Sequence, residues 1–154
     1  AWFIDKIQYV NNANEEIDAI GQVDLQQTAI VDSKFKEALK GVNEGYKDSL
    51  STIRLTIYEP NQLVYETSSP QDGIVVFSEI YYPGWTATID GKPADIARAD
   101  YILRAMNVPA GKHTIEMRFD PKSLHVTEGI AYSGLALLII GAIAGLWIYC
   151  RKKQ

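Results

Sequence analysis

The strongest constraint on this chain is an apolar run close to its C-terminus. Residues 130–150 contain no Asp, Glu, Lys, Arg, His, Asn or Gln, and nine of these 21 residues are Leu or Ile. At a rise of about 1.5 Å per residue, a helix of this length spans about 31 Å, which matches the roughly 30 Å hydrocarbon core of a bilayer. The Leu and Ile residues alone favour insertion by roughly 3–5 kcal/mol. A buried helix of a soluble protein is usually shorter and carries a polar stripe. The run therefore predicts one transmembrane helix at 130–150.

Basic residues directly after the run predict its orientation. The sequence Arg-Lys-Lys occupies 151–153, and positive charge next to a span favours the cytoplasmic side. We therefore expect an integral membrane protein, with a cytoplasmic tail at 151–154 and the preceding domain outside. The alternative is a tail-anchored protein whose domain lies in the cytoplasm. Export of a domain that precedes its span requires an earlier signal or earlier spans, so we expect a longer parent protein.

Small residues within the run indicate a packing face. Gly141 and Gly145 form a GxxxG pair, and Gly134 lies one heptad earlier. Such residues allow another helix to approach closely, so that dispersion and weak hydrogen bonds act between the backbones. We expect this face to contact transmembrane helices of the parent protein, in preference to a second copy of the chain.

Charge and cysteine content exclude several function classes. All 19 acidic residues precede the run, with 12 of the 15 Lys and Arg, so this part carries a formal charge of −7. Nucleic acid is therefore excluded as a partner, because phosphate binding needs a basic face. The only cysteine is Cys150, so no disulfide can form within the chain. No nucleophile motif, phosphate-binding loop or metal-ligand spacing occurs, so we expect no catalytic residue, cofactor or metal. His113 is interpreted as a strand-surface histidine and Asp90 as a turn residue.

The hydrophobic pattern before the run predicts a mainly β fold. The first 50 residues are mixed: a strand at 2–10, a helix capped by Asn12 that ends at Ile20, a short strand at 28–31, helical turns at 34–40 and a loop at 43–51. From Thr52 the apolar residues recur with a period of two, and turn signals follow about every ten residues. The run at 74–81 is nearly all apolar, which is typical of a strand buried on both faces, and Asp90-Gly91 indicates a tight hairpin.

These elements predict an antiparallel β-sandwich of jelly-roll or Ig-like type with short N-terminal helices, followed by the transmembrane helix. The expected organisation is a mixed α/β part at 1–50 and a sandwich part at 51–123 of one soluble domain. A juxtamembrane linker at 124–129, the span at 130–150 and the basic tail at 151–154 complete the chain.

Three aromatic residues form the candidate binding site. Tyr81, Tyr82 and Trp85 surround a Pro-Gly turn, close in sequence to Asp90 and Lys92. Sugar rings stack on aromatic faces while polar groups bind their hydroxyls, so these residues are candidates for contact with a glycan or a lipid headgroup. The competing interpretation is that they pack the sandwich core or its rim, since aromatic residues are common in strands.

The stretch FSEIYYPGWTATIDGKPADIARADYILRAMNVPAGKHTIEMRFDPKS, at 77–123, resembles the C-terminal region of the YfhO family of bacterial polytopic membrane proteins. The elements that carry the resemblance are YYPGW at 81–85, IDGKPA at 89–94 and VPAGKHTIE at 108–116; the opening WFIDKIQYVNNANEEIDAI also fits. The resemblance implies a parent with many N-terminal spans in a bacterial inner or plasma membrane, similar to GT-C-type glycosyltransferases that use lipid-linked sugars. Catalytic acidic residues are expected there between early spans, so none is assigned to this chain, and the parent's own activity stays open.

The sequence thus predicts a non-catalytic extracytoplasmic domain and the last membrane span of a YfhO-like protein. Its expected partners are the lipid bilayer, the parent's transmembrane helices and a lipid-linked sugar or envelope glycan, and its expected role is accessory to glycan transfer or assembly. The alternative is a membrane-anchored module that binds glycan or is purely structural.

Overall fold

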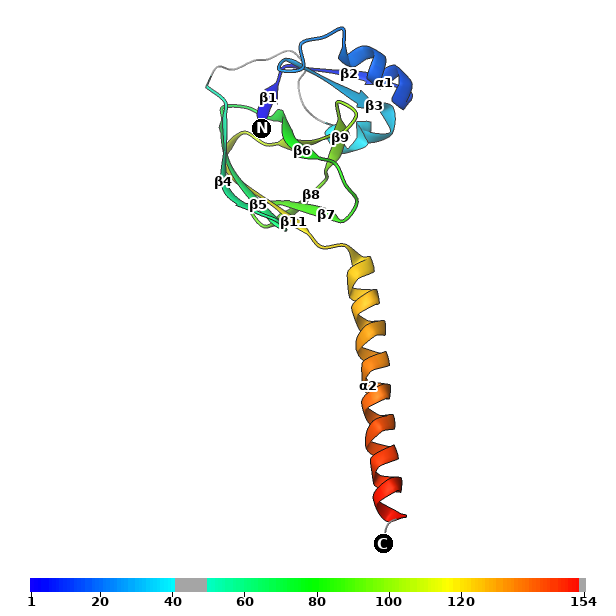
Figure 1. Cartoon of the computed structure of the whole chain (residues 1–154). Coiled ribbons are helices and arrows are strands. Elements are labelled where there is room, and N and C mark those ends of the chain that lie inside the picture. Colours follow the sequence, from blue (N-terminus) through cyan, green and yellow to red (C-terminus); the bar gives the residue numbers. More distant parts are fainter. Residues whose placement is uncertain (41–49, 153–154) are drawn as a thin grey trace. The chain divides into compact units, whose positions relative to one another are not determined.

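The computed structural model describes residues 1–40 and 50–152, so most of the loop predicted at 43–51 lies outside the described residues. The predicted fold class is confirmed: 47% of the chain is strand, in mainly antiparallel sheets, and one apolar helix follows (Figure 1). The chain divides into two compact units, Ala1–Phe119 and Asp120–Gln154. Each unit is described by itself.

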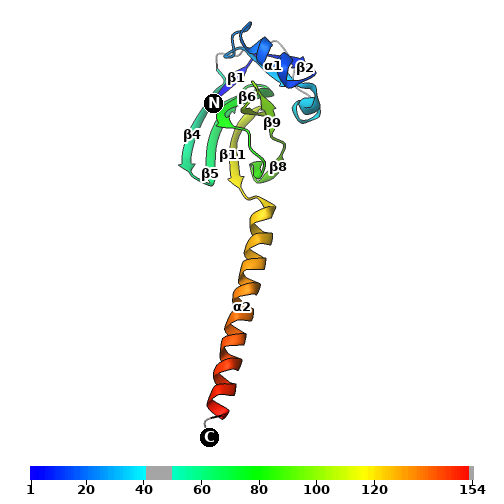
Figure 2. The same ribbon diagram turned by 45° about the vertical axis from the view of Figure 1, so that its right-hand side comes forward.

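Two sheets of the first unit form the sandwich (Figure 2). The five-stranded sheet has the order β4 (Thr52–Glu59), β5 (Gln62–Ser69), β11 (Gly111–Phe119), β7 (Trp85–Ile89) and β8 (Lys92–Ala94). The four-stranded sheet has the order β1 (Trp2–Ile4), β6 (Gly73–Ile80), β10 (Leu103–Val108) and β9 (Ala97–Ala99). Their facing side chains share one core, in which Phe77, Met106, Ile115 and Met117 are fully buried. Burial of such side chains contributes about 1.5–3 kcal/mol each.

A third layer covers the other face of the four-stranded sheet. It consists of β2 (Lys6–Val10), α1 (Ala13–Ile20), β3 (Thr28–Asp32) and the 3-10 helix η1 (Ser33–Leu39). β2 and β3 pair in parallel, with α1 as the crossover. Ile7, Val31 and Leu39 of this layer pack against Ile74 and Val76 of β6. β6 is therefore buried on both faces from Ile74 to Phe77, which confirms the prediction for the first half of its apolar run, whereas Ser78 and Ile80 are exposed.

The single strand predicted at 2–10 is divided between two sheets. β1 pairs with β6 and β2 pairs with β3, and the chain changes sheet at Asp5. The Asp5 backbone N–H donates to the Gln27 carbonyl oxygen at 2.8 Å, which anchors this corner. The first part of the segment therefore extends the four-stranded sheet, and the second part belongs to the third layer.

Two local predictions are confirmed in atomic detail. Asn12 caps α1, because its side-chain oxygen accepts hydrogen bonds from the N–H groups of Asn14 and Glu15 at 3.1 and 3.0 Å. The Glu15 carboxylate returns to the Asn11 backbone N–H at 3.0 Å, a variant of the capping box. At the predicted hairpin, Asp90 and Gly91 have φ values of 51° and 78°. Asp and Gly tolerate this left-handed conformation, which a two-residue turn requires.

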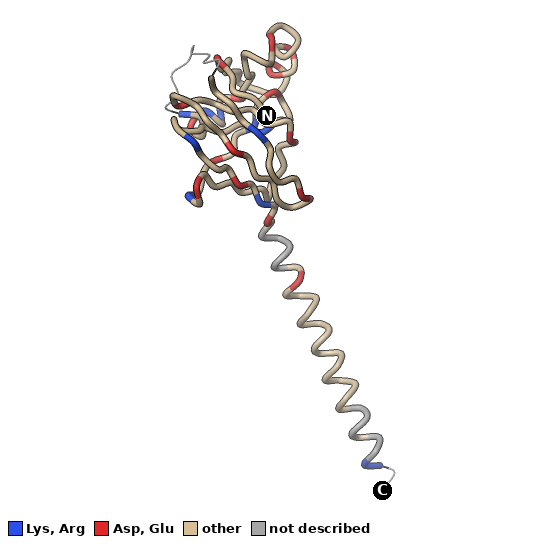
Figure 3. The backbone as a smooth tube through the Cα atoms, turned by 90° about the vertical axis from the view of Figure 1, so that its left-hand side faces the viewer, with Lys and Arg blue, Asp and Glu red and all other residues tan. Residues whose placement is uncertain are grey.

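The second unit is one long helix, α2 (Lys122–Arg151). The stretch Thr127–Ala144 is long and apolar enough to cross a membrane and has no residue buried within the protein. Figure 3 shows a long section of α2 without charge. The predicted span at 130–150 lies within this helix, and residues 124–129, predicted as a linker, belong to it as well.

Candidate functional site

The three aromatic residues singled out from the sequence do not form one cluster. Tyr82 and Trp85 converge on Phe119 of β11, with ring centroids 6.2 and 5.5 Å from the Phe119 ring. Tyr81 contacts the ring of Phe35 in η1 instead, edge-on at 5.5 Å. Tyr82 is 62% exposed, whereas Trp85 and Phe119 are half-buried. Sequence reasoning missed Phe119, which follows from the pairing of β11 with β7 that sets Phe119 opposite Trp85.

A buried arginine occupies one face of the Trp85 ring. The Arg104 guanidinium carbon lies 4.0 Å from the indole centroid. Its Nε donates to the Ile80 carbonyl oxygen at 2.9 Å, and Nη1 lies 3.6 Å from the Met117 sulfur. Burial lowers the pKa of Arg104, opposed by the nearby Glu79 charge, but a guanidinium remains charged in proteins. Arg104 covers this face and Phe119 packs against the ring, so the position of the Trp85 side chain is fixed by its neighbours. The ring that faces solvent is that of Tyr82.

The polar groups proposed to accompany Trp85 lie at the other end of β7. Asp90 follows the last residue of that strand, and Trp85 is its first. The Asp90 carboxylate accepts from His113 Nδ1 at 2.6 Å and from the Thr114 backbone N–H at 2.9 Å. His113 Nε2 lies 2.9 Å from the Ala110 carbonyl oxygen. Trp85 and Asp90 therefore do not form one sugar-binding site.

The environment of His113 favours the imidazolium. An ionised carboxylate and a carbonyl oxygen are both acceptors only, so both ring nitrogens must donate. The hydrogen bond to Asp90 and the bond to Ala110 raise the pKa of His113. The hydrogen bond from His113 in turn lowers the pKa of Asp90. With both nitrogens engaged, His113 has no lone pair free for a metal or for general-base catalysis in this geometry.

A hollow of about 490 Å³ lies across β4, β5 and β11. Hydroxyl and charged groups line it, among them Thr52, Arg54, Glu66, Ser68, Lys112 and Thr114. Arg54 and Glu66 pair across the strands at 2.8 Å and are both largely exposed. Such a lining offers both hydrogen-bond donors and hydrogen-bond acceptors at the surface of the sheet. No sequence motif marks this hollow, because its residues come from three separate strands.

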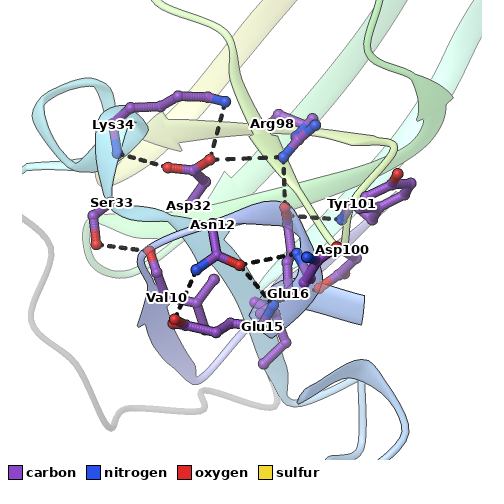
Figure 4. A network of polar contacts seen from close by, with 12 residues as sticks. Val10, Asn12, Glu15, Glu16, Asp32, Ser33, Lys34, Arg98, Asp100 and Tyr101 are labelled. Carbon is purple, nitrogen blue, oxygen red and sulfur yellow. Dashed lines mark hydrogen bonds and ion pairs between the residues drawn. The ribbon is translucent and has the colours of Figure 1, made fainter. Parts of the chain in front are cut away.

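A second polar cluster is buried between the third layer and the four-stranded sheet (Figure 4). Glu16 of α1 is completely buried. Its Oε2 lies 2.5 Å from Arg98 Nη2, and its Oε1 accepts from the Tyr101 backbone N–H at 2.8 Å. Asp32 Oδ2 lies 3.9 Å from the same Arg98 nitrogen. This cluster joins α1, β3 and β9, so it ties the third layer to the sandwich.

Asp100 completes the same junction in a strained turn. Asp100 and Tyr101 have φ values of 49° and 70°, the left-handed region. Two hydrogen bonds join Asp100 to Ile30. The Asp100 N–H donates to the Ile30 carbonyl oxygen at 2.7 Å, and the Ile30 N–H donates to Asp100 Oδ1 at 2.8 Å. Burial raises the pKa of Asp100 to about 6, with the hydrogen bond from Ile30 opposing this and the charge of Glu16 adding to it. Across residues 1–40 and 50–152, no group of His, Cys, Asp and Glu side chains is arranged to hold a metal ion.

Most of the elements described above fall within the region that a known protein family covers. The family model for the bacterial membrane protein YfhO matches residues 16–131. The chain belongs to the YfhO family. The match includes both carboxylate clusters, the Tyr82–Trp85–Phe119 contacts and the first residues of the apolar stretch of α2. Comparisons with curated proteins and with solved structures gave no match. A membrane protein family and a helix able to span a bilayer together indicate membrane association.

The glycines of this YfhO helix leave open positions on its surface. A Cβ placed on Gly134 or Gly141 would meet no atom within 4 Å. The surroundings of Gly145 lie outside the described residues. Contact of these glycines with another helix therefore stays a prediction. Gly141→Ile in the full-length parent should lower its abundance in the membrane if a neighbouring helix packs there.

Proposed function

We propose that this chain is the extracytoplasmic domain and last membrane span of a YfhO parent protein, and that it assists the parent in transferring a lipid-linked sugar or assembling an envelope glycan. The family match carries this proposal, because residues 16–131 run from α1 through both sheets into the apolar helix as one family unit. The resemblance of the family to GT-C-type glycosyltransferases supplies the substrate class.

The engagement of the clustered charged groups supports an accessory role. Glu16 is enclosed with Arg98, and Asp90 is held by His113. Acid–base catalysis needs a group that can exchange a proton with a bound substrate. These side chains instead join elements of the fold, and Arg104 supports Trp85. The chemistry of the parent is therefore assigned to other parts of that protein.

The basic tail supports the orientation with the domain outside. A labelling experiment in the full-length parent tests it, with Cys150, the only cysteine of this chain, and any cysteine elsewhere in the parent replaced by Ser to give a blank background. Single cysteines are introduced by Thr114→Cys in the domain and Lys152→Cys in the tail. A membrane-impermeant maleimide should label the Thr114→Cys variant in intact cells and the Lys152→Cys variant only after lysis. The reverse pattern would place the domain in the cytoplasm.

The accessory role is tested in the full-length parent. Removal of residues 1–119 with all spans retained should lower glycan transfer per molecule of parent in the membrane. Transfer is therefore normalised to the amount of membrane-inserted parent. Unchanged transfer after this normalisation would reject the proposed role.

Glycan binding is the second candidate, favoured by the polar hollow on β4, β5 and β11. A glycan array with the whole chain in detergent compares the unmodified protein with Ser68→Trp, which fills the hollow, and Trp85→Ala at the other end of the sheet. Loss of signal in Ser68→Trp alone would locate binding in the hollow. Loss in Trp85→Ala alone would locate it at the aromatic residues, and equal signals from all three proteins would rule out both sites.

A further inference from the structure

Four aromatic residues lie toward the end of the five-stranded sheet where β11 finishes, three of them in contact with one another and Tyr58 on the edge strand β4. We call Tyr58, Tyr82, Trp85 and Phe119 the aromatic end. Trp85 pairs with Phe119 across the strands, and the Tyr82 ring packs on Phe119. Tyr58 lies opposite Leu63, which in turn lies opposite Met117, close to the end of β11. Tyr58 and Tyr82 are 70% and 62% exposed, so two of the four rings face solvent.

The covalent chain keeps this end close to the bilayer. Phe119 is the last residue of β11 and Lys122 the first of α2, so their Cα atoms are at most about 11 Å apart. The candidate span begins at Thr127, about 8 Å further along the helix. These limits hold for any orientation of the two units. Because the headgroup layer is roughly 5–8 Å thick on each side of a bilayer, the end of β11 lies at most about 14 Å from the lipid headgroups.

The two ends of this sheet differ in chemistry. The turns at the opposite end are Ser-Pro-Gln-Asp at 69–72, Asp-Gly at 90–91 and Ala-Gly-Lys at 110–112. The β4–β5 turn at the aromatic end, Glu-Pro-Asn at 59–61, is polar as well, so the two ends differ in the aromatic residues, which these opposite turns lack. Tyr and Trp are enriched at membrane–water interfaces, because one part of each ring system is apolar while the O–H or N–H remains hydrogen-bonded.

Electrostatic attraction does not explain membrane contact here. The part of the chain before the apolar run carries a formal charge of −7, so its net charge would not attract an anionic lipid surface. Contact through uncharged rings does not depend on the charge of the lipid. The Arg104 guanidinium, enclosed beneath Trp85, holds that ring in place without presenting a basic patch.

We propose that the aromatic end inserts the Tyr58 and Tyr82 rings into the headgroup layer of the bilayer that α2 crosses. The occupant of this surface is lipid, and the domain docks on it through the end at which the chain enters the membrane. This docking is independent of any sugar transfer by the parent, so the two proposals succeed or fail separately.

Depth-dependent fluorescence quenching tests the docking. The whole chain, with Cys150→Ser, is placed in nanodiscs of zwitterionic lipid and labelled at Asn61→Cys or Thr114→Cys. Asn61 is exposed in the β4–β5 turn, and its carbonyl accepts from the Phe119 N–H; Thr114 is exposed near the opposite end of β11. A headgroup-attached quencher should quench the label at 61 several-fold more strongly than the label at 114. Equal quenching at the two positions would overturn the proposal.

Two further arms identify the cause of the difference. Tyr58→Ser with Tyr82→Ser should abolish the extra quenching at position 61 while the circular dichroism spectrum stays unchanged. Quenching that persists in this double variant, or that depends on added anionic lipid, would contradict insertion by the aromatic rings. Absence of quenching in nanodiscs, with protection of position 61 only in the full-length parent, would assign the surface to other parts of that protein and reject lipid as its occupant.

Discussion

Two carboxylate–cation clusters in the first unit differ chiefly in their access to water. Glu16 and Arg98 have side chains that are 0% and 19% exposed, whereas those of Asp90 and His113 are 49% and 18% exposed. Both clusters join elements that are distant in sequence. In the buried cluster each charge depends on its partner, because water cannot replace it. In the outer cluster water can replace a missing partner. The stability of the fold should therefore depend far more on the Glu16–Arg98 cluster than on the Asp90–His113 cluster.

The strongest test of this difference removes the buried carboxylate. Glu16→Ala leaves the enclosed Arg98 guanidinium without its main acceptor and the Tyr101 N–H without a partner. We expect the free energy of unfolding to fall by about 3–5 kcal/mol, the usual cost of breaking a buried pair on one side. Urea unfolding of the chain in detergent, followed by circular dichroism, measures it.

Glu37→Ala is the matched control. Glu37 pairs with Lys40 on the surface, and loss of such a pair should cost less than about 1 kcal/mol. Similar losses in the two variants would show that burial does not distinguish these carboxylates.

A second test uses the proton affinity of Asp100, next to the buried cluster. Its folded pKa is about 6, above the ordinary value of 3.8, because it is buried. The stability it contributes is fully present below pH 3.8 and is lost as the pH rises through about 6. Asp100→Asn keeps an oxygen for the Ile30 N–H and removes the titration. Above pH 6 the variant should be more stable than the unmodified chain by about 1–2 kcal/mol.

The pH series of unfolding free energies for both proteins, from pH 4 to 8, gives the result. The difference between them should grow with pH and level off above pH 7. A difference that is constant across this range would mean that Asp100 does not change its charge there.

The smallest effect is expected at the outer cluster. His113→Gln removes the imidazolium and keeps a donor toward Asp90. The raised pKa of His113 means that its contribution is present below its ordinary value of 6.5 and is lost as the pH rises through the folded value. The lowered pKa of Asp90 means that its contribution is lost as the pH falls through its folded value, below 3.8.

The unmodified chain and His113→Gln should therefore differ most between pH 3.8 and 6.5 and converge once the pH exceeds the raised pKa of His113. The difference should stay small because Asp90 is exposed. NMR titration of the His113 ring gives its pKa directly. A value at or below 6.5 would remove the basis for this window.

Local sequence chemistry predicted the parts of this fold that depend on neighbours in the chain. The apolar run at 74–81 indicated a central strand, Asn12 and Glu15 a helix start, and Asp90-Gly91 a hairpin. Each of these depends on residues within one element or one turn. The apolar run at 130–150 likewise predicted a helix with no polar side.

The remainder depended on partners that sequence patterns do not reveal. Apolar residues occur on both sides of Asp5, so the segment 2–10 resembles one strand, and the strands that divide it between two sheets lie far away in the sequence. Glu16 occupies the inner face of α1, and its partner Arg98 is 82 positions away. The three aromatic residues of the candidate site separate for the same reason. The strand register places Phe119 opposite Trp85, whereas Tyr81 packs against Phe35. The embedding of Arg104 under Trp85 could not be foreseen, because arginine in a strand normally faces water.

One property of β4 bears on how copies of this chain behave when a membrane confines them to a plane. Among the residues that the structure describes, β4 is the longest strand at a sheet edge, and Leu55 and Ile57 on it are each 41% exposed. Its pairing with β5 shifts by one residue between these two positions, where the Thr56 hydroxyl bonds to the Val64 carbonyl. A strand from another copy of the chain could pair regularly with the backbone N–H and C=O groups of β4 on only one side of that irregularity. Copies crowded in the membrane should therefore associate poorly through β4, although this edge strand is long and exposes apolar side chains.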